Sequence, residues 1–377
     1  MKKTKLSFIA LLASLALVGC GGNGNSNGGD STGGDKPSTP AEKTYVVGVK
    51  SESKYIVDNV ITSKKDIGDA YAMKGTELGE GKVCTLEWFE QAKEIETAVV
   101  GKTSSEINSA ESFGQATIYV GSLKNAIIEA VDYSAKKHVG PQADNAPVKQ
   151  DFENGGVKAD ASVYPGLGYV ASFDSAKQQA TVTVAYATFN GEGKVVDARF
   201  DVVQINTIVT ADQKAAATPV AVEGGTDKGI VASKLEKGKN YGMYQNPSEL
   251  AEVDEQIEAL ADWSVGKTAA EFATESAKVV YGGQYEEGAD KPAWINQASI
   301  TTSDFSKALA NAYAKAQEAT AVAVTAESRA GVGIVVDAVS NSGELSVNIS
   351  GAMVKGGKVE NALVDAVVFP TEVVEKK

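Results

Sequence analysis

The sequence has little histidine and cysteine: its 377 residues contain one His and two Cys. This count excludes histidine-rich and thiolate-rich metal sites. The single histidine, His138, follows two lysines in a stretch typical of a solvated helix end, so a Ser-His-Asp triad is not predicted. Basic residues are outnumbered, with 36 Lys and Arg against 49 Asp and Glu and a net charge of −13. Nucleic-acid binding is therefore excluded, because phosphate contacts need clustered cations.

The N-terminal apolar run is too short to cross a bilayer. Leu6–Val18 holds 13 residues, whereas a span needs about 20. Three lysines precede this run, and Leu17-Val18-Gly19-Cys20 ends it. The arrangement resembles the signal peptide and lipobox of bacterial lipoproteins, which implies that Cys20 becomes the first mature residue and carries a diacylglycerol on its sulfur. Two acyl chains anchor a protein stably where one is marginal. The alternative is an ordinary cleaved signal with a chance cysteine.

A polar segment follows the cysteine. From Gly21 to Lys43 no apolar residue is larger than Ala or Pro, so the segment cannot bury enough surface to offset its ordering entropy. We therefore predict a signal peptide over 1–19, a disordered tether over 20–43 and a folded body after it. Anionic lipid repels an acidic body. We therefore predict that the protein attaches to the membrane only through lipid on Cys20.

The body contains repeated pieces, and the first is a turn between two helices. Residues 100–107 and 265–272 share the pattern Val-Gly-Lys-Thr-x-x-Glu. A phosphate-binding loop would need a further glycine where Glu96 and Ala261 stand. We predict instead that the shared glycine ends one helix and that a Thr-x-x-Glu capping box begins the next.

Two further pieces also recur. The segments 181–203 and 344–368 alternate apolar and polar residues around a Gly-rich turn, and each follows a Gly-x-Gly at 166–168 or 331–333. Such alternation predicts antiparallel hairpins. The segments 114–131 and 296–313 each read as a short polar turn followed by an amphipathic helix.

The order of these pieces predicts an α+β fold of two similar units, each an antiparallel hairpin or sheet packed against helices. Residues 44–145 would be the helical part of unit 1, and 160–325 would be unit 2, with hairpin and helices. We expect the C-terminal hairpin, 326–377, to complete unit 1, because either half alone would expose an apolar face. The alternative is that this hairpin extends the sheet of unit 2.

The combination of a Gly-x-Gly hairpin, helices and an Ala-Thr turn resembles bacterial FMN-binding domains. The two repeats of this chain would be degenerate copies of such a domain in tandem. In that family a threonine after Gly-Ala takes FMN covalently through its phosphate, and the domains pass electrons outside the cytoplasm. The matching segments are Gln115-Ala116-Thr117-Ile118 and Gln297-Ala298-Ser299-Ile300. The resemblance implies Thr117 and Ser299 as FMN attachment points. Both copies have Gln where the family has Gly, and the other interpretation of each hydroxyl is a turn that satisfies backbone amides.

Several functions remain open. Cys84 is expected to be a small buried apolar residue, and no catalytic or metal-ligating residues are predicted. The favoured function is a lipid-anchored extracytoplasmic lipoprotein, non-enzymatic, with a binding or structural role toward a small molecule, a flavin or a cell-surface partner. The alternative is a flavin-bearing electron carrier with FMN as cofactor, where the favoured function needs none. A third possibility follows from Leu12–Gly19, which is similar to peptide pheromones released from lipoprotein signal peptides.

Overall fold

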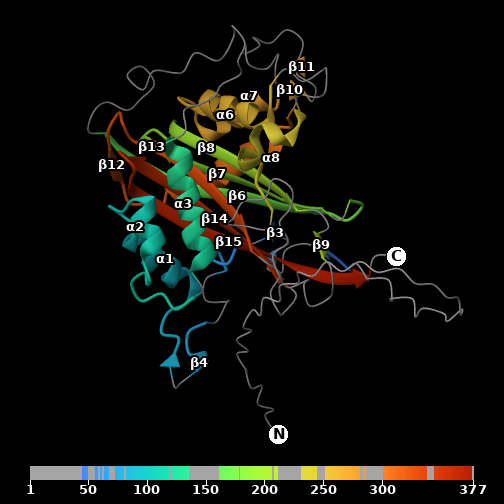
Figure 1. Cartoon of the computed structure of the whole chain (residues 1–377). Coiled ribbons are helices and arrows are strands. Elements are labelled where there is room, and N and C mark those ends of the chain that lie inside the picture. Colours follow the sequence, from blue (N-terminus) through green and yellow to red (C-terminus); the bar gives the residue numbers. More distant parts are fainter. Residues whose placement is uncertain are drawn as a thin grey trace, which may run out of the picture. The chain divides into compact units, whose positions relative to one another are not determined.

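Two antiparallel sheets carry the helices in a computed structural model of the chain (Figure 1). All the residues described below belong to one unit, residues 42–377. The structure describes residues 45–49, 56–57, 60–61, 63–67, 73–79, 82–118, 120–135, 161–177, 179–205, 208–210, 231–243, 251–280, 284–285, 300–337 and 344–375. The predicted signal peptide and tether, with Cys20, lie outside these residues, as do His138 and Ser299.

The first sheet has five strands. In order across the sheet they are β13 (Arg329–Val336), β14 (Glu344–Lys355), β15 (Lys358–Glu375), β1 (Tyr45–Val49) and β9 (Ile208–Thr210). Gly356 and Gly357 make the tight turn between β14 and β15 with φ of 55° and 76°, which glycine adopts without strain. Strand β1 pairs with the far end of β15, from Tyr45 opposite Glu375 to Val49 opposite Thr371.

The second sheet has four strands. In order they are β12 (Val322–Val324), β6 (Ala161–Asp174), β7 (Gln179–Phe189) and β8 (Val195–Ile205). Both predicted hairpins are therefore confirmed, and the pairs β14–β15 and β7–β8 each contain one register shift beside the turn. Short two-stranded ribbons are made by β2 (Ile56–Val57) with β3 (Val60–Ile61), β4 (Glu77–Gly79) with β5 (Lys82–Val83), and β10 (Val279–Val280) with β11 (Gln284–Tyr285).

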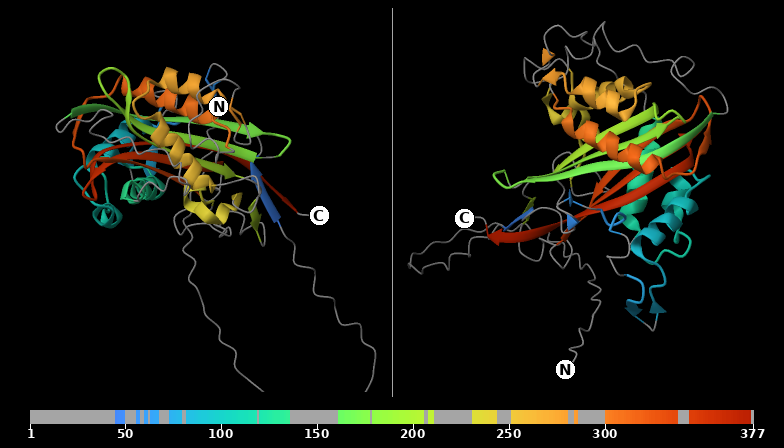
Figure 2. Two further views of the ribbon diagram at one scale, coloured as in Figure 1. Left: turned by 90° about the horizontal axis from the view of Figure 1, so that it is seen from above. Right: turned by 180° about the vertical axis from the view of Figure 1, so that it is seen from behind.

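Each sheet carries its own group of helices, as Figure 2 shows from two sides. On the five-stranded sheet lie α1 (Trp88–Ala98) and α3 (Gly121–Ala135), and α2 (Ser104–Ser109) packs against α3. Around the four-stranded sheet lie α5 (Lys234–Lys237), η3 (Gly238–Tyr241), α6 (Val253–Ser264), α7 (Ala269–Ser276) and α8 (Ser303–Ala316). The α+β class is thus the observed one, with two similar units of antiparallel strands and helices. The helices of residues 88–135 lie on the C-terminal hairpin, although the exact domain boundaries stay a prediction.

The Gly-x-Gly motifs let one helix approach each sheet closely. A Cβ at Gly331 or Gly333 would overlap the backbone of α3, and one at Gly166 or Gly168 would overlap the backbone of α8. Only glycine leaves room for a helix at this distance. The motif therefore marks the helix-bearing face of each sheet.

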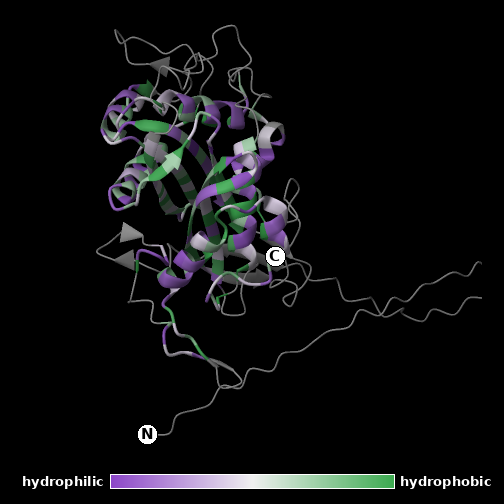
Figure 3. Ribbon diagram, turned by 90° about the vertical axis from the view of Figure 1, so that its left-hand side faces the viewer, coloured by the Kyte–Doolittle hydropathy of each residue, from purple (hydrophilic) through white to green (hydrophobic). Residues whose placement is uncertain are grey.

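The opposite faces of the two sheets meet in one core. Figure 3 shows apolar residues along the strands, and buried residues of both sheets belong to a single cluster. Tyr186 on β7 packs where a side chain at Gly351 on β14 would stand. A second cluster lies between α1, α3 and the C-terminal hairpin, and it includes Ile95, Ile127 and Val364.

The two Gly-Lys-Thr turns have the predicted role. Gly101 and Gly266 take φ of 80° and 81° after α1 and α6. The next threonine in each copy, Thr103 or Thr268, caps the following helix in a reciprocal pair with a glutamate. The turns also dock on the hairpins, since the N–H groups of Gly101 and Gly266 donate to carbonyl oxygens of β15 and β8 at 2.7 and 2.8 Å.

Candidate functional site

Thr117 stands in the short turn between α2 and α3, and the side chain of Gln91 holds it there. The Gln91 Oε1 atom accepts hydrogen bonds from the Thr117 N–H at 2.6 Å, the Thr117 hydroxyl at 3.1 Å and the Ile118 N–H at 2.9 Å. Gln91 is buried on α1, whereas Thr117 is exposed. The threonine hydroxyl therefore donates to a side chain, and among the described residues no backbone N–H donates to it, whereas the alternative predicted a hydroxyl that satisfies backbone amides.

The remaining amides of the turn are also occupied. The Gln115 N–H donates to Glu94 Oε2 at 3.1 Å, and the Ala116 N–H donates to the Phe113 carbonyl at 3.1 Å. A phosphate binds where several backbone N–H groups point outward together. Here each N–H from 115 to 118 has an acceptor, and one acceptor is a carboxylate. The turn therefore does not fit an FMN phosphate held by backbone amides.

The FMN-binding pattern has a glycine directly before the alanine, where this chain has Gln115. The nearest glycine is Gly114, one residue earlier, and its role is different. Gly114 has a positive φ of 57°, and a side chain there would overlap the carboxylate of Glu94. Gly114 thus makes room for a protein carboxylate, which repels a second anion.

Cys84 lies behind this turn and is 1% exposed, as predicted. Its Sγ accepts from Gln91 Nε2 at 3.2 Å, lies 3.1 Å from the Leu86 carbonyl oxygen and is 3.6 Å from Thr117 Oγ1. The thiol is therefore a polar packing partner of Gln91, beneath the exposed hydroxyl.

The second repeat has the same glutamine. Gln256 on α6 is buried, its Oε1 accepts from the Ile300 N–H at 3.2 Å, and its Nε2 donates to the Ala251 carbonyl at 2.8 Å. Gln91 makes the matching bond to the Leu86 carbonyl at 3.1 Å. Sequence reasoning missed both glutamines, although each stands ten residues before the glycine of a Gly-Lys-Thr turn. Ser299 itself lies outside the described residues.

Two repeated carboxyls are buried beneath another pair of turns. Asp365 on β15 accepts from the Lys65 N–H at 3.1 Å and the Ser63 hydroxyl at 2.5 Å. Asp201 on β8 accepts from the Leu235 N–H at 3.1 Å. Burial raises the pKa of Asp365 to about 6 and that of Asp201 to about 7. Each carboxyl binds a turn with the sequence Ser-Lys, at residues 63–64 and 233–234. This repeat was not predicted from the sequence.

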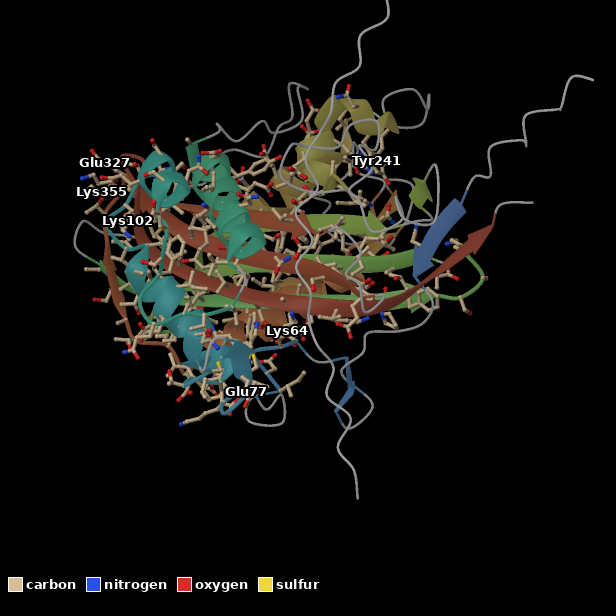
Figure 4. The ribbon with its side chains drawn as sticks, turned by 60° about the horizontal axis from the view of Figure 1, so that its bottom comes forward. Lys64, Glu77, Lys102, Tyr241, Glu327 and Lys355 are labelled. Carbon is tan, nitrogen blue, oxygen red and sulfur yellow. The ribbon has the colours of Figure 1, made fainter. Side chains whose placement is uncertain are left out.

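Lysines line the outer side of the first helical group. Lys64, labelled in Figure 4, lies over the Trp88 ring at 5.8 Å from its centroid. Lys102, in the same figure, lies 5.7 Å from the Phe113 ring. Both aromatic residues are buried, at 3% and 1% exposure, and each ammonium stabilises its ring modestly.

The described residues contain no group of three or more His, Cys, Asp or Glu side chains placed to hold a metal ion. None of the helices in the described part of the chain is long and apolar enough to cross a membrane. No protein-family model matches the chain, and a search of curated proteins gave no match either.

Proposed function

We propose that the protein is an extracytoplasmic lipoprotein, anchored to the bacterial cell membrane by lipid on Cys20, whose body has a non-enzymatic binding or structural role. The observation that carries the anchoring is Leu17-Val18-Gly19-Cys20 at the end of a short apolar run with lysines before it. What supports a body without bound flavin is the turn at 115–118, because protein acceptors occupy its N–H groups.

Detergent partition tests the anchor. The full chain, made in a bacterium that matures lipoproteins, is expected in the detergent phase after Triton X-114 extraction, since buried acyl CH₂ groups contribute about 0.8 kcal/mol each. Cys20→Ser should move it to the aqueous phase. Cys84→Ser is the matched control, because it removes the other thiol and should leave the partition unchanged. A Cys20→Ser chain that stays in the detergent phase would contradict the proposal.

A flavin-bearing electron carrier is the second candidate, and one observation favours it: Thr117 is exposed in a turn that precedes a helix. Intact mass of the full chain after co-expression with a flavin transferase decides between the two. We expect no added FMN. An added FMN mass that disappears in Thr117→Ala or Ser299→Ala would show flavin attachment and overturn the non-enzymatic function.

A further inference from the structure

An open cleft of about 280 Å³ lies where the end of α8 meets the hairpin turn between β7 and β8. It is lined by the start of β6, the end of β7, the turn at 190–193 and the last turn of α8. Figure 1 shows α8 lying over β6 and β7. Small-molecule sites begin at roughly 300 Å³, so the cleft has room for a single ring of a ligand whose remainder extends into solvent.

The cleft is lined by neutral residues. None of its eight described lining residues is charged, although 23% of the residues of the chain are. Glu192 and Lys194 belong to the same hairpin turn, but neither lines the cleft. The C-terminal end of a helix carries partial negative charge, and the end of α8 is part of this cleft. An anionic ligand would therefore meet no cation and an unfavourable helix end.

Two tyrosine rings form the apolar part of the cleft. Tyr164 on β6 stands directly opposite Phe189 on β7, and Tyr313 projects from α8 with its ring centroid 5.1 Å from that of Phe189. Phe189 is 1% exposed, whereas both tyrosines are half-buried. The phenylalanine therefore supports the two tyrosines from the core, and the tyrosines present surface to a ligand.

The polar groups of the cleft include donors and acceptors that no protein group uses. Asn190 Oδ1 accepts from the N–H groups of Glu192 at 3.0 Å and Lys194 at 2.9 Å, which leaves the Asn190 Nδ2 group as a donor. No described residue bonds to this Nδ2, to the two tyrosine hydroxyls or to the Gln317 amide, and all of these groups reach solvent. A ligand that fits must therefore both accept and donate hydrogen bonds.

The first unit has the same framework without this cleft chemistry. Gly357, the counterpart of Gly193 in the other hairpin turn, has no atom within 4 Å of the position of a Cβ, whereas at Gly193 that position is 2.6 Å from the Tyr313 hydroxyl oxygen. The matching hairpins, Gly-x-Gly motifs and helices align Tyr164 with Arg329, Phe189 with Val354, Asn190 with Lys355, and Tyr313 with Val131. The fold therefore does not require aromatic residues at these positions, and the cleft belongs to the second unit alone.

The arrangement also distinguishes between uncharged and cationic ligands. An organic cation could lie over the tyrosine rings, but it would offer no acceptor to Asn190 Nδ2, and the lining has no carboxylate to pair with it. A neutral sugar ring has C–H groups on its faces and hydroxyls at its edge, and a hydroxyl both donates and accepts. Only this class matches the rings and the amides together.

We propose that this cleft binds a neutral carbohydrate through one sugar ring. The C–H face of the ring lies against Tyr164 and Tyr313, and its hydroxyls bond to Asn190 Nδ2 and to the Gln317 amide. The ligand class rests on the binding role proposed above. A free sugar and one residue of a polysaccharide share this chemistry.

Saturation-transfer NMR on the purified full-length protein tests the class, in a detergent without a sugar headgroup. The neutral probes are D-glucose, D-galactose, D-mannose and N-acetyl-D-glucosamine, and the charged probes are D-glucuronate and choline. We expect a neutral sugar to bind more tightly than either charged probe, since burying a charge without a partner is unfavourable. Saturation should be strongest on the ring C–H protons, which contact the tyrosines.

Tetrasaccharides distinguish the two sources of the sugar. The probes are cellotetraose, built from glucose, and chitotetraose, built from N-acetyl-D-glucosamine. Tighter binding of a tetramer than of its monomer would indicate a polysaccharide, because further rings then contact the surface beside the cleft. Equal binding would indicate a free sugar.

The first unit supplies the decisive variant. Tyr313→Val introduces the residue found at the matching position and should weaken binding at least about tenfold, the effect of one lost aromatic contact. Gln317→Ala changes an exposed residue and should weaken binding about two- to tenfold, so the test does not depend on how Tyr313→Val folds. Tyr241→Val is the control, because Tyr241 is also a half-buried tyrosine packed on the core but does not line the cleft; binding should be unchanged.

Three results would overturn the proposal: no binding of any neutral sugar, tighter binding of choline or glucuronate than of every neutral sugar, or full binding by either folded cleft variant. If no sugar binds and the intact mass shows no flavin, the carbohydrate site is wrong while the anchored non-enzymatic function stands. If Cys20→Ser stays in the detergent phase or FMN is found on Thr117, the proposed function is wrong whatever the cleft binds.

Discussion

The backbone N–H and the hydroxyl of Thr117 both donate to a single oxygen of Gln91. That oxygen also accepts from the next N–H in the chain, so one buried amide determines the shape of the turn before α3. The exposed residue is thus positioned from inside the molecule, by a side chain 26 residues earlier.

Gln91→Leu should therefore destabilise the protein by about 2–4 kcal/mol, because it leaves two backbone N–H groups without an acceptor. Urea unfolding followed by circular dichroism measures this change. Gln256→Leu changes the matching residue of the second repeat, whose Oε1 accepts from the Ile300 N–H, and should also be destabilising. A Gln91→Leu protein as stable as the wild type would show that the Thr117 bonds add nothing.

Gly331→Ala should destabilise the protein by at least about 1–3 kcal/mol, the usual effect of overpacking, because its methyl group would overlap the backbone of α3. The melting temperature of the purified variant reports this change. Gly191→Ala is the control, since a Cβ there meets no atom within 4 Å, and it should melt close to the wild type. A Gly331→Ala protein as stable as this control would refute the close helix approach.

Stability should fall as pH rises through neutrality because of Asp201, whose pKa burial raises to about 7. Between about pH 4 and pH 7 the folded carboxyl holds a proton that the unfolded one has lost, so its contribution is present at low pH and is lost as pH rises. The effect is about 4 kcal/mol at most. Asp365, with a pKa of about 6, acts in the same direction.

The free energy of unfolding, measured by urea from about pH 5 to about pH 8, should fall less steeply with pH in Asp201→Asn than in the wild type, because one titrating carboxyl is removed. Asp174 is the contrast. Hydrogen bonds from Lys177 lower its pKa, so Asp174→Asn removes a contribution that is lost as pH falls. An Asp201→Asn slope identical to the wild type would mean that this carboxyl titrates normally.

Thr103→Ala and Thr268→Ala should each cost about 1 kcal/mol, because each hydroxyl accepts from an N–H in the first turn of its helix. Thermal unfolding measures both, with Thr97→Ala as the control, since its hydroxyl only donates to the Lys93 carbonyl within α1. If only one of the two variants lost stability, the two turns would not be equivalent.

Repeats and alternation in the sequence predict much of the fold, because hairpins and caps are local. The turn glycines at 101 and 266 and the strands around residues 190 and 356 follow from spacing within about ten residues. The burial of Cys84 also follows from its isolation as a thiol.

The site could not be predicted in the same way, because its contacts join distant residues. Gln91 reaches Thr117 from another helix, and Asp365 reaches Ser63 across 302 residues. From the sequence alone, a glutamine in a helix cannot be distinguished from an ordinary solvent-facing polar residue, because its partner is not known. The ion pair of Lys315 with Asp66 likewise joins elements that only the folded chain brings together.

The placement of α1 and α3 on the C-terminal hairpin bears on the order in which the parts of the chain fold. These helices lie about 200 residues before β13, β14 and β15, the strands that cover their apolar faces. Contacts of such high sequence separation form late and slowly. We expect the second unit, whose hairpin and helices are closer in sequence, to form first. The apolar faces of α1 and α3 then stay uncovered until β13, β14 and β15 pair.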